Sequence, residues 1–564
     1  MAMSIYFNRR SALLALGSAG VLSACALVPD QAPATSSPSP AKVFLHGVAS
    51  GDPDTTSVVL WTRISGATED VPVTWEVASD ADFTNVVRTG TQSATAAADF
   101  TVKVIAGDLS PGERIYFRFK ALEEISPTGR TKALPAGRVE NFGIALASCS
   151  NYCFGHFNAY DAIAKDDAID LVLHTGDYIY EYGAGEWGHE TASTIGRAHN
   201  PAHEMVTLED YRLRHAQYKT DPASQAMHAA HPFVACWDDH ESTNNPWTDG
   251  AGNHQPDTEG DWIQRRNASI QAYYEWMPVR DPATVEARTE FWRTYVIGDL
   301  ATLITLETRH TARGEQVDYS RYKDTLKSPA DRDAFMSAVI GDPARKMISG
   351  GMEDVLATGL SRSVAAGEPW RVIGNASPIA RMLVPDVQRF GITPADAPAA
   401  EQPGAGPNLF WKGEWNLPFY TDTWDGYPAA REAFYALCRA AGAGDLLVLT
   451  GDSHSFWANT LSDASGQPMG LEVGTAGITS PGDFVESGWL GESPERLDRV
   501  FEAALDEVRW TDNLHQGYVR VVLGRTEARV SYVAVDTVLR PDYAARVIRE
   551  ETIERGRGTI AWKA

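Results

Sequence analysis

The pattern of apolar and polar positions changes near residue 140. In residues 43–140, short apolar runs such as residues 58–64 and an alternating stretch at residues 71–77 are separated by turn signals such as Pro111-Gly112. Short strands at regular spacing predict a small all-β sandwich domain. The stretch holds no cluster of chemically reactive residue types, so we expect its role to be structural.

From residue 141 onward, buried-looking strands end in polar clusters. The apolar runs at residues 142–147, 171–174, 233–237 and 445–450 are each followed by such a cluster. Because ligands bind beyond the carboxyl ends of strands in α/β sheets, we expect the four clusters to converge on one site. The pattern assigns residues 141–540 to a catalytic α/β domain and residues 541–564 to a C-terminal helix and tail.

The first 28 residues are typical of an export signal. Arg9 and Arg10 precede an apolar stretch at residues 12–28, which is the arrangement of a twin-arginine signal. A chance arginine pair before an ordinary Sec signal would give the same pattern. Either signal predicts an exported protein in the periplasm or at the cell surface.

A second processing signal follows within the same segment. The run Leu-Ser-Ala-Cys at residues 22–25 is similar to a lipoprotein box, which would make Cys25 a lipid anchor to the membrane. The alternative is ordinary cleavage further on, after Ala34, which would leave the mature protein without a membrane anchor. Residues 29–42 are rich in Pro, Ser and Ala and are predicted to form a flexible tether.

The cluster that follows residues 171–174 joins a carboxylate to a phenol. Asp177 and Tyr180 lie three residues apart. A carboxylate has two oxygens and can bridge two metal ions, and a phenolate is a hard anionic ligand that suits a trivalent ion. The alternative is a capping aspartate beside an aromatic core residue.

Two further clusters contain the same ligand types. Residues 238–241, Asp-Asp-His-Glu, place three carboxylates and an imidazole after a buried strand, where their burial is costly unless a cation neutralises them. The alternative is a solvated loop. Asp452 and His454 follow another strand and a glycine, and a bend is needed before both can reach one metal pair. Alone, such a pair is more often structural.

Three roles are open for Cys149, which lies two residues after the apolar run at residues 142–147. A thiolate there could be a metal ligand. It could also be a buried free thiol, or half of a disulfide with Cys153. Apart from Cys25 the chain has only four cysteines, so it is not a disulfide-dense scaffold.

Size and charge narrow the classes of function. The 564 residues are too many for one compact core, and 43% of them are hydrophobic, a globular value. A net charge of −25 repels nucleic acid backbones, so a nucleic-acid-binding role is disfavoured. The charge also repels phosphate substrates, so a phosphate-cleaving site would need bound cations to create a local positive potential. Ordinary acidic solvation of an exported protein is the alternative account of the charge.

The motifs, taken in order, resemble those of the PhoD-like alkaline phosphatase family, a branch of the calcineurin-like metallophosphoesterases. The resemblance covers nearly the whole chain. Its marks are HGVASGDP at residues 46–53, LWTR at 60–63, ASC at 147–149, FNAY at 157–160, LHTGDYIYE at 173–181, WDDHE at 237–241 and GDSH at 451–454.

The resemblance implies an α/β fold in which an αββα metallophosphatase sandwich core is preceded by the small all-β sandwich domain. It also implies a site with a ferric ion (Fe³⁺) and calcium (Ca²⁺). By motif position, Asp177 would bridge the metals, Cys149, Tyr180 and His454 would bind iron, and Asp239 and Asp452 would bind calcium.

Three further residues are carried over as groups that act on the substrate. His240 would face the phosphate. Arg309, in Leu-Glu-Thr-Arg at residues 306–309, is a weaker carry-over whose alternative is a salt bridge. Asn375 follows another apolar strand and could line the site.

The function implied is an exported metal-dependent phosphoesterase of the alkaline phosphatase D type. It would hydrolyse phosphate monoesters or diesters by two-metal activation of water. A phospholipase D-like phosphodiesterase acting on phospholipid head groups is the second enzyme hypothesis. A non-catalytic surface protein with an adhesive sandwich domain is the third, and the complete ligand set argues against it.

Overall fold

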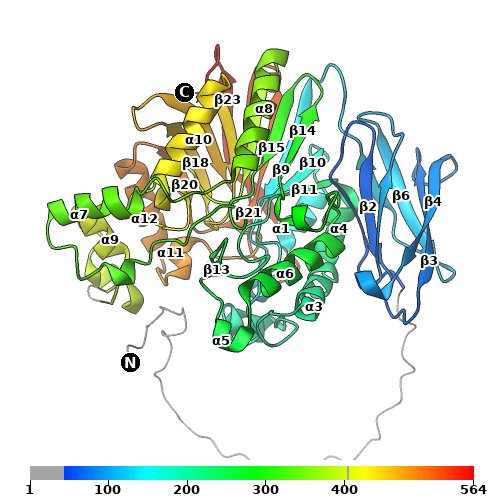
Figure 1. Cartoon of the computed structure of the whole chain (residues 1–564), viewed down its shortest axis with the longest axis horizontal. Helices are drawn as coiled ribbons and strands as arrows, with labels where there is room; N and C mark the ends of the chain where they lie inside the picture. The colour runs from blue at the N-terminus through cyan, green and yellow to red at the C-terminus, as the bar shows by residue number, and fades with distance from the viewer. Residues whose placement is uncertain (1–42, 403–404, 564) are drawn as a thin grey trace, which may run out of the picture.

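The computed structural model describes residues 43–402 and 405–563 (Figure 1). The predicted export signal, the tether and Cys25 lie outside the described residues. Within those residues, no helix combines the length and the hydropathy that crossing a bilayer requires.

The first domain is built from one small sheet and from the end of a larger sheet, which together enclose a core at the blue end of the chain in Figure 1. Every second residue of strand β6 is buried, and the side chains of Ile115, Phe117 and Phe119 therefore point into this core. One sheet contains β1 (Val48–Gly51), β2 (Val58–Arg63) and β5 (Thr101–Ala106), and the other contains β3 (Val71–Ala78), β4 (Val86–Ala94), β6 (Arg114–Ala121), β7 (Glu124–Ile125) and β8 (Gly129–Lys132).

Two larger sheets pack face to face in the rest of the described chain. Apolar side chains from both inner faces, such as Leu173 and Leu449, form one continuous core. The first sheet runs in the order β24 (Ile560–Trp562), β23 (Ala545–Arg555), β22 (Glu527–Val535), β21 (Gln516–Gly524), β9 (Asn141–Ala147), β10 (Leu171–His174) and β11 (Phe233–Ala235), and continues into β1, β2 and β5. The second runs in the order β14 (Arg293–Ile297), β15 (Ala301–Thr305), β16 (Trp370–Asn375), β17 (Leu446–Thr450), β19 (Pro468–Gly474), β18 (Phe456–Ser462) and β20 (Val508–Asp512).

Helices cover both outer faces, which completes the predicted αββα sandwich (Figure 1). On the first sheet lie α1 (Asn158–Ala164), α3 (Leu208–Lys219), α4 (Pro222–Ala230) and α6 (Trp262–Trp276), and on the second lie α8 (Gly350–Ala366) and α10 (Pro428–Ala440). Since β9, β10 and β11 are parallel, and β15, β16, β17 and β19 are parallel, the carboxyl ends of each set share one edge of their sheet.

The prediction of a C-terminal helix in residues 541–564 is wrong. This segment forms β23 and β24, which extend the ten-strand order to its outer edge. Strand β23 lies next to the outermost strand, β24, which pairs with it only at Ile553–Arg555. Ile553 is buried, whereas Arg546, Glu550 and Glu554 are exposed. Charged side chains of this kind protect the part of a strand that no neighbour covers.

The first domain is joined to the sandwich through Asp52. Gly51 pairs with Phe233 of β11, so the small domain continues the large sheet. The carboxylate of Asp52, next in the chain, accepts hydrogen bonds from the backbone N–H of Arg280 (2.8 Å), the Arg293 Nε (3.2 Å) and the Tyr295 hydroxyl (3.1 Å). Asp52 is buried, and it therefore anchors one domain to the other.

We predict that Asp52→Asn destabilises the protein by about 2–4 kcal/mol, because it leaves the partly buried Arg293 without its charge partner. The melting temperature of the whole protein is the measurement. Asp167→Asn is the matched control, since the Asp167 side chain is 87% exposed. A melting temperature for Asp52→Asn equal to that of the control would contradict this role of Asp52.

Candidate metal centre

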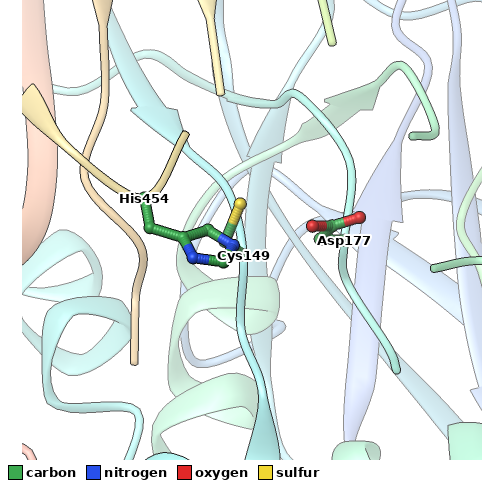
Figure 2. Close-up of side chains that lie close together, drawn as sticks. All are labelled: Cys149, Asp177 and His454. Atoms are coloured by element: carbon green, nitrogen blue, oxygen red, sulfur yellow. The ribbon is translucent and has the colours of Figure 1, made fainter. Parts of the chain in front are cut away.

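The strand-end clusters converge, and potential ligand atoms lie within 4.8 Å of one another in three overlapping groups. Figure 2 shows the side chains of the first group close together. The groups are Cys149, Asp177 and His454; Asp177, Asp239 and His240; and Asp238, Asp239 and Asp452. Asp177 and Asp239 each belong to two groups, so the three form one continuous site.

Tyr180 lies beside two members of the first group, Asp177 and His454. Its hydroxyl donates to Asp177 Oδ2 (3.0 Å) and lies 3.5 Å from His454 Nε2 and 3.0 Å from Ser480 Oγ. Burial, followed by the charge of Asp177, raises the pKa of Tyr180 well above its usual value. The structure thus brings Tyr180 together with the predicted iron ligands.

Four of the predicted ligands have a left-handed backbone conformation. The φ angles are 61° at Cys149, 58° at Asp177, 65° at Asp452 and 56° at His454. Residues other than glycine seldom adopt this conformation, and such strain gathers at functional sites. The turn that each strand makes at its end is therefore what aims these side chains at one point.

Two glycines let the strand-end loops approach closely. A Cβ atom added at Gly176 would lie 2.3 Å from the Asp238 Cβ, and one added at Gly451 would lie 2.2 Å from the Ser148 Oγ. No larger residue fits at either position without displacing a neighbouring loop. The glycines that precede Asp177 and Asp452 therefore have a packing role in the site.

Glu241 fastens two of the loops together. Its carboxylate accepts hydrogen bonds from the backbone N–H groups of Asp177 (3.1 Å), Tyr178 (2.6 Å) and Asp238 (2.8 Å). Burial raises the pKa of Glu241 to about 7 although these bonds favour its charged form. Glu241 therefore positions the ligands, and its oxygens are used within the protein.

The carboxylates of the site carry more negative charge than their surroundings neutralise. Burial, with the charge of neighbouring aspartates, raises the pKa of Asp177 and of Asp452 well above the ordinary value. The Asp238 Oδ2 and Asp239 Oδ1 atoms are buried and have no hydrogen-bond partner among the described residues. Bound cations would neutralise this charge and fill these unused acceptor positions, so the donor set fits metal ions.

Cys149 is fully buried and unbonded to any other cysteine. Cys149 and Cys153 are both free thiols, so the predicted alternative of a disulfide between them is absent from the structure. Burial, and then the charge of Asp177, raises the pKa of Cys149 well above that of an ordinary thiol. A metal ion would reverse that direction, since a coordinating thiol loses its proton.

His240 connects the two ends of the site. Its Nδ1 lies 2.6 Å from Glu181 Oε2, its Nε2 lies 3.8 Å from Asp239 Oδ2, and its ring lies 4.2 Å from that of Tyr180. Burial alone would lower the pKa of His240, but the charges of Asp239, Glu181 and Asp177 raise it well above 6.5. The carboxylates around the imidazole therefore favour its charged form.

Arg309 is fully buried among aspartates. Its Nε donates to Asp238 Oδ1 (2.5 Å), and its terminal nitrogens lie 3.5 Å from Asp422, 3.8 Å from Asp239 and 3.6 Å from Asp452. The salt-bridge alternative is thus present, although the guanidinium also faces two predicted ligands. Asp422 was missed because it lies in an irregular segment, with no strand or motif to single it out.

Asn375 ends β16 and pairs with Thr450 of β17, two residues before Asp452. Its Nδ2 donates to the Ser377 carbonyl (2.5 Å), and its Oδ1 accepts a long bond from Trp424 Nε1 (3.4 Å). The side chain therefore supports the turn that follows β16.

Trp187 was also missed by sequence reasoning. Its ring is nearly parallel to those of His240 and His454, at centroid distances of 6.2 and 5.9 Å. It lies in the loop after β10, where no apolar periodicity marks it. Trp187 provides an aromatic wall beside the ligand groups.

Comparisons with known proteins agree with this geometry. The family model described as PhoD-like phosphatase matches residues 144–532, and that for the PhoD-like phosphatase N-terminal domain matches residues 30–135. Alkaline phosphatase D of Bacillus subtilis (strain 168) is 36% identical over 517 residues, which are 89% of this chain and 79% of that protein.

Solved structures are similar as well. A structure described as PhoD is 30% identical, covers 94% of both chains and has a TM-score of 0.74. A purple acid phosphatase from yellow lupin seeds is 11% identical over 90% of this chain and 74% of its own, with a TM-score of 0.48. The family models, the Bacillus subtilis relative and the PhoD structure confirm the predicted fold class and phosphoesterase function. The chain belongs to the PhoD-like phosphatase family.

Proposed function

We propose that this protein hydrolyses small phosphate monoesters and diesters at one mixed metal centre. Iron would be held by Cys149, Tyr180 and His454, and calcium by Asp239 and Asp452. The observation that carries the proposal is the position of Asp177, which shares one group with Cys149 and His454 and another with Asp239. A carboxylate shared in this way is suited to bridge two cations.

The donor types support two different cations. Thiolate, phenolate and imidazole together favour a transition metal, whereas the carboxylates at the other end favour a hard cation such as calcium. Bound cations would act as Lewis acids on the phosphoryl group and lower the pKa of the attacking water.

The protein's own groups hold and direct charge around that chemistry. His240, fixed through Nδ1 by Glu181, would in its charged form donate the Nε2 proton to the leaving oxygen of the ester. Arg309 offsets the charge of Asp238 and keeps a fixed cation near Asp239 and Asp452. Asn375, at the end of β16, would line the site while its amide holds the turn that follows.

We further propose that the protein is exported by the twin-arginine route, with Arg9 and Arg10 as its signal. Such a route carries folded proteins, which suits a buried centre that is loaded with metal before export. Lipidation at Cys25 would then tether the enzyme at the membrane surface. The sequence features at residues 1–42 are the support for this part of the proposal.

We predict that Asp177→Asn abolishes the shared ligand, with loss of bound metal and a fall in kcat/KM of at least about 100-fold, because the bridging charge is gone. Elemental analysis and hydrolysis of an aryl phosphate monoester and a diester measure the two effects. Asp333→Asn is the control, since that side chain is 72% exposed.

The same assay tests the function itself. The wild-type protein is expected to cleave both small esters. Wild-type activity and metal content in Asp177→Asn would remove Asp177 from the site, and cleavage of a phospholipid without cleavage of either small ester would contradict the proposed substrate class.

Cys149 gives a second prediction with a matched control nearby. If Cys149 binds iron, thiolate-to-iron charge transfer contributes to the visible absorption, and Cys149→Ser should shift or bleach that band and lower activity. Cys153→Ser should change neither, although both thiols are equally buried. An unchanged spectrum and metal content in Cys149→Ser would show that the thiol is not a ligand.

A further inference from the structure

Arg313, on the segment that follows β15, is buried without an acceptor. The residue is 1% exposed, and none of its three guanidinium nitrogens has a hydrogen-bond partner among the described residues. The guanidinium makes a cation–π contact instead, because its Cζ lies 5.3 Å from the centre of the Tyr427 ring. The buried guanidinium therefore has no anionic or carbonyl partner within hydrogen-bond distance.

The positive charge of Arg313 has to be accommodated in the protein interior. A guanidinium does not lose its proton in proteins, so Arg313 is a permanent cation. Placing an unpaired charge in the interior costs several kcal/mol, and buried charges are normally paired for this reason. No carboxylate of the described residues forms an ion pair with Arg313, so a bound anion would compensate for its charge.

The neighbourhood of Arg313 adds positive charge. The Cζ of Arg345 lies 4.4 Å from the same Tyr427 ring, and the buried Arg345 Nε also has no partner among the described residues. Burial, followed by the charges of Arg266, Arg309 and Arg313, lowers the pKa of His310 to about 3. The region has a positive potential, which favours an anion over a neutral water.

The carboxylate of Glu307, which lies on the same segment, is already used. Its Oε1 accepts from the backbone N–H groups of Arg309 (2.8 Å) and His310 (2.7 Å), and its Oε2 accepts from that of Thr311 (3.0 Å). It organises the backbone between Arg309 and Arg313 and does not pair with the Arg313 side chain.

We propose that Arg313 and Arg345 hold a small inorganic anion of halide size beside Tyr427. This proposal does not depend on the proposed phosphoesterase function. The donors are the three unpartnered nitrogens of Arg313 and the Nε of Arg345, whose other two nitrogens donate to the carbonyls of Glu315 and Gly426. The positive potential selects for a negative ion.

The location gives the anion a structural effect on the loop that follows Asp239. The backbone N–H and the Oγ1 of Thr248 both donate to the Arg313 carbonyl (3.1 Å each). Earlier in that loop, the N–H of Asn245 donates to Asp239 Oδ2 (2.9 Å). An anion that fixes Arg313 would therefore stabilise the loop that holds a predicted calcium ligand.

Bromide is the probe for this site, because it has the size of a halide and a strong anomalous signal. Crystals of the whole protein soaked in sodium bromide should show an anomalous peak within contact distance of the Arg313 guanidinium. Absence of a peak there at saturating bromide, with ordered water or an oxyanion in its place, would overturn the proposal.

A solution measurement covers the same claim without crystals. Replacing chloride by gluconate at constant ionic strength should lower the melting temperature of the wild-type protein by about 2 °C or more. Arg313→Met should lose this dependence on chloride, whereas Arg389→Met, a control whose side chain is 82% exposed, should keep it. Equal dependence in wild type and Arg313→Met would contradict the site.

Discussion

Buried negative charge at one edge of two packed sheets is the constraint on which the rest of the centre depends. Asp177, Asp238 and Asp239 are buried and Asp452 is half-buried, and burial raises the pKa of Asp177, Asp238 and Asp452. Arg309 compensates for only part of this charge. Cation binding and the stability of the folded site should therefore be coupled, because each cation removes a cost that folding alone cannot remove.

The backbone conformation holds the carboxylates together in spite of their mutual repulsion. Left-handed turns at the strand ends aim the ligands, and Gly176 and Gly451 allow the loops to meet without collision. Glu241 then joins the loops after β10 and β11 through three backbone hydrogen bonds. The ligands thus lie at the ends of strands and are held by a second set of polar contacts. This arrangement is expected where the positions of metal ligands are fixed before the metal binds.

The site residues that could be predicted from the sequence are those marked by a pattern of neighbouring residues. A buried strand followed by a polar cluster marks Asp177 and Asp452, and the parallel sheet brings such ends together. Sequence reasoning missed Asp422 and Trp187, which reach the site from irregular segments, and it predicted a helix where the chain forms strands β23 and β24. The continuity of the first domain with the large sheet rests on one long-range pairing, Gly51 with Phe233, which no local pattern encodes.

Anomalous X-ray diffraction from crystals of the metal-loaded protein, at wavelengths on either side of the iron absorption edge, tests the central claim most directly. The account predicts an iron peak bonded to Cys149 Sγ, Tyr180 Oη and His454 Nε2. It also predicts a second, non-iron metal peak at Asp239 and Asp452, with Asp177 between the two. A single metal, or an iron peak without a bond to Cys149, would contradict the mixed centre.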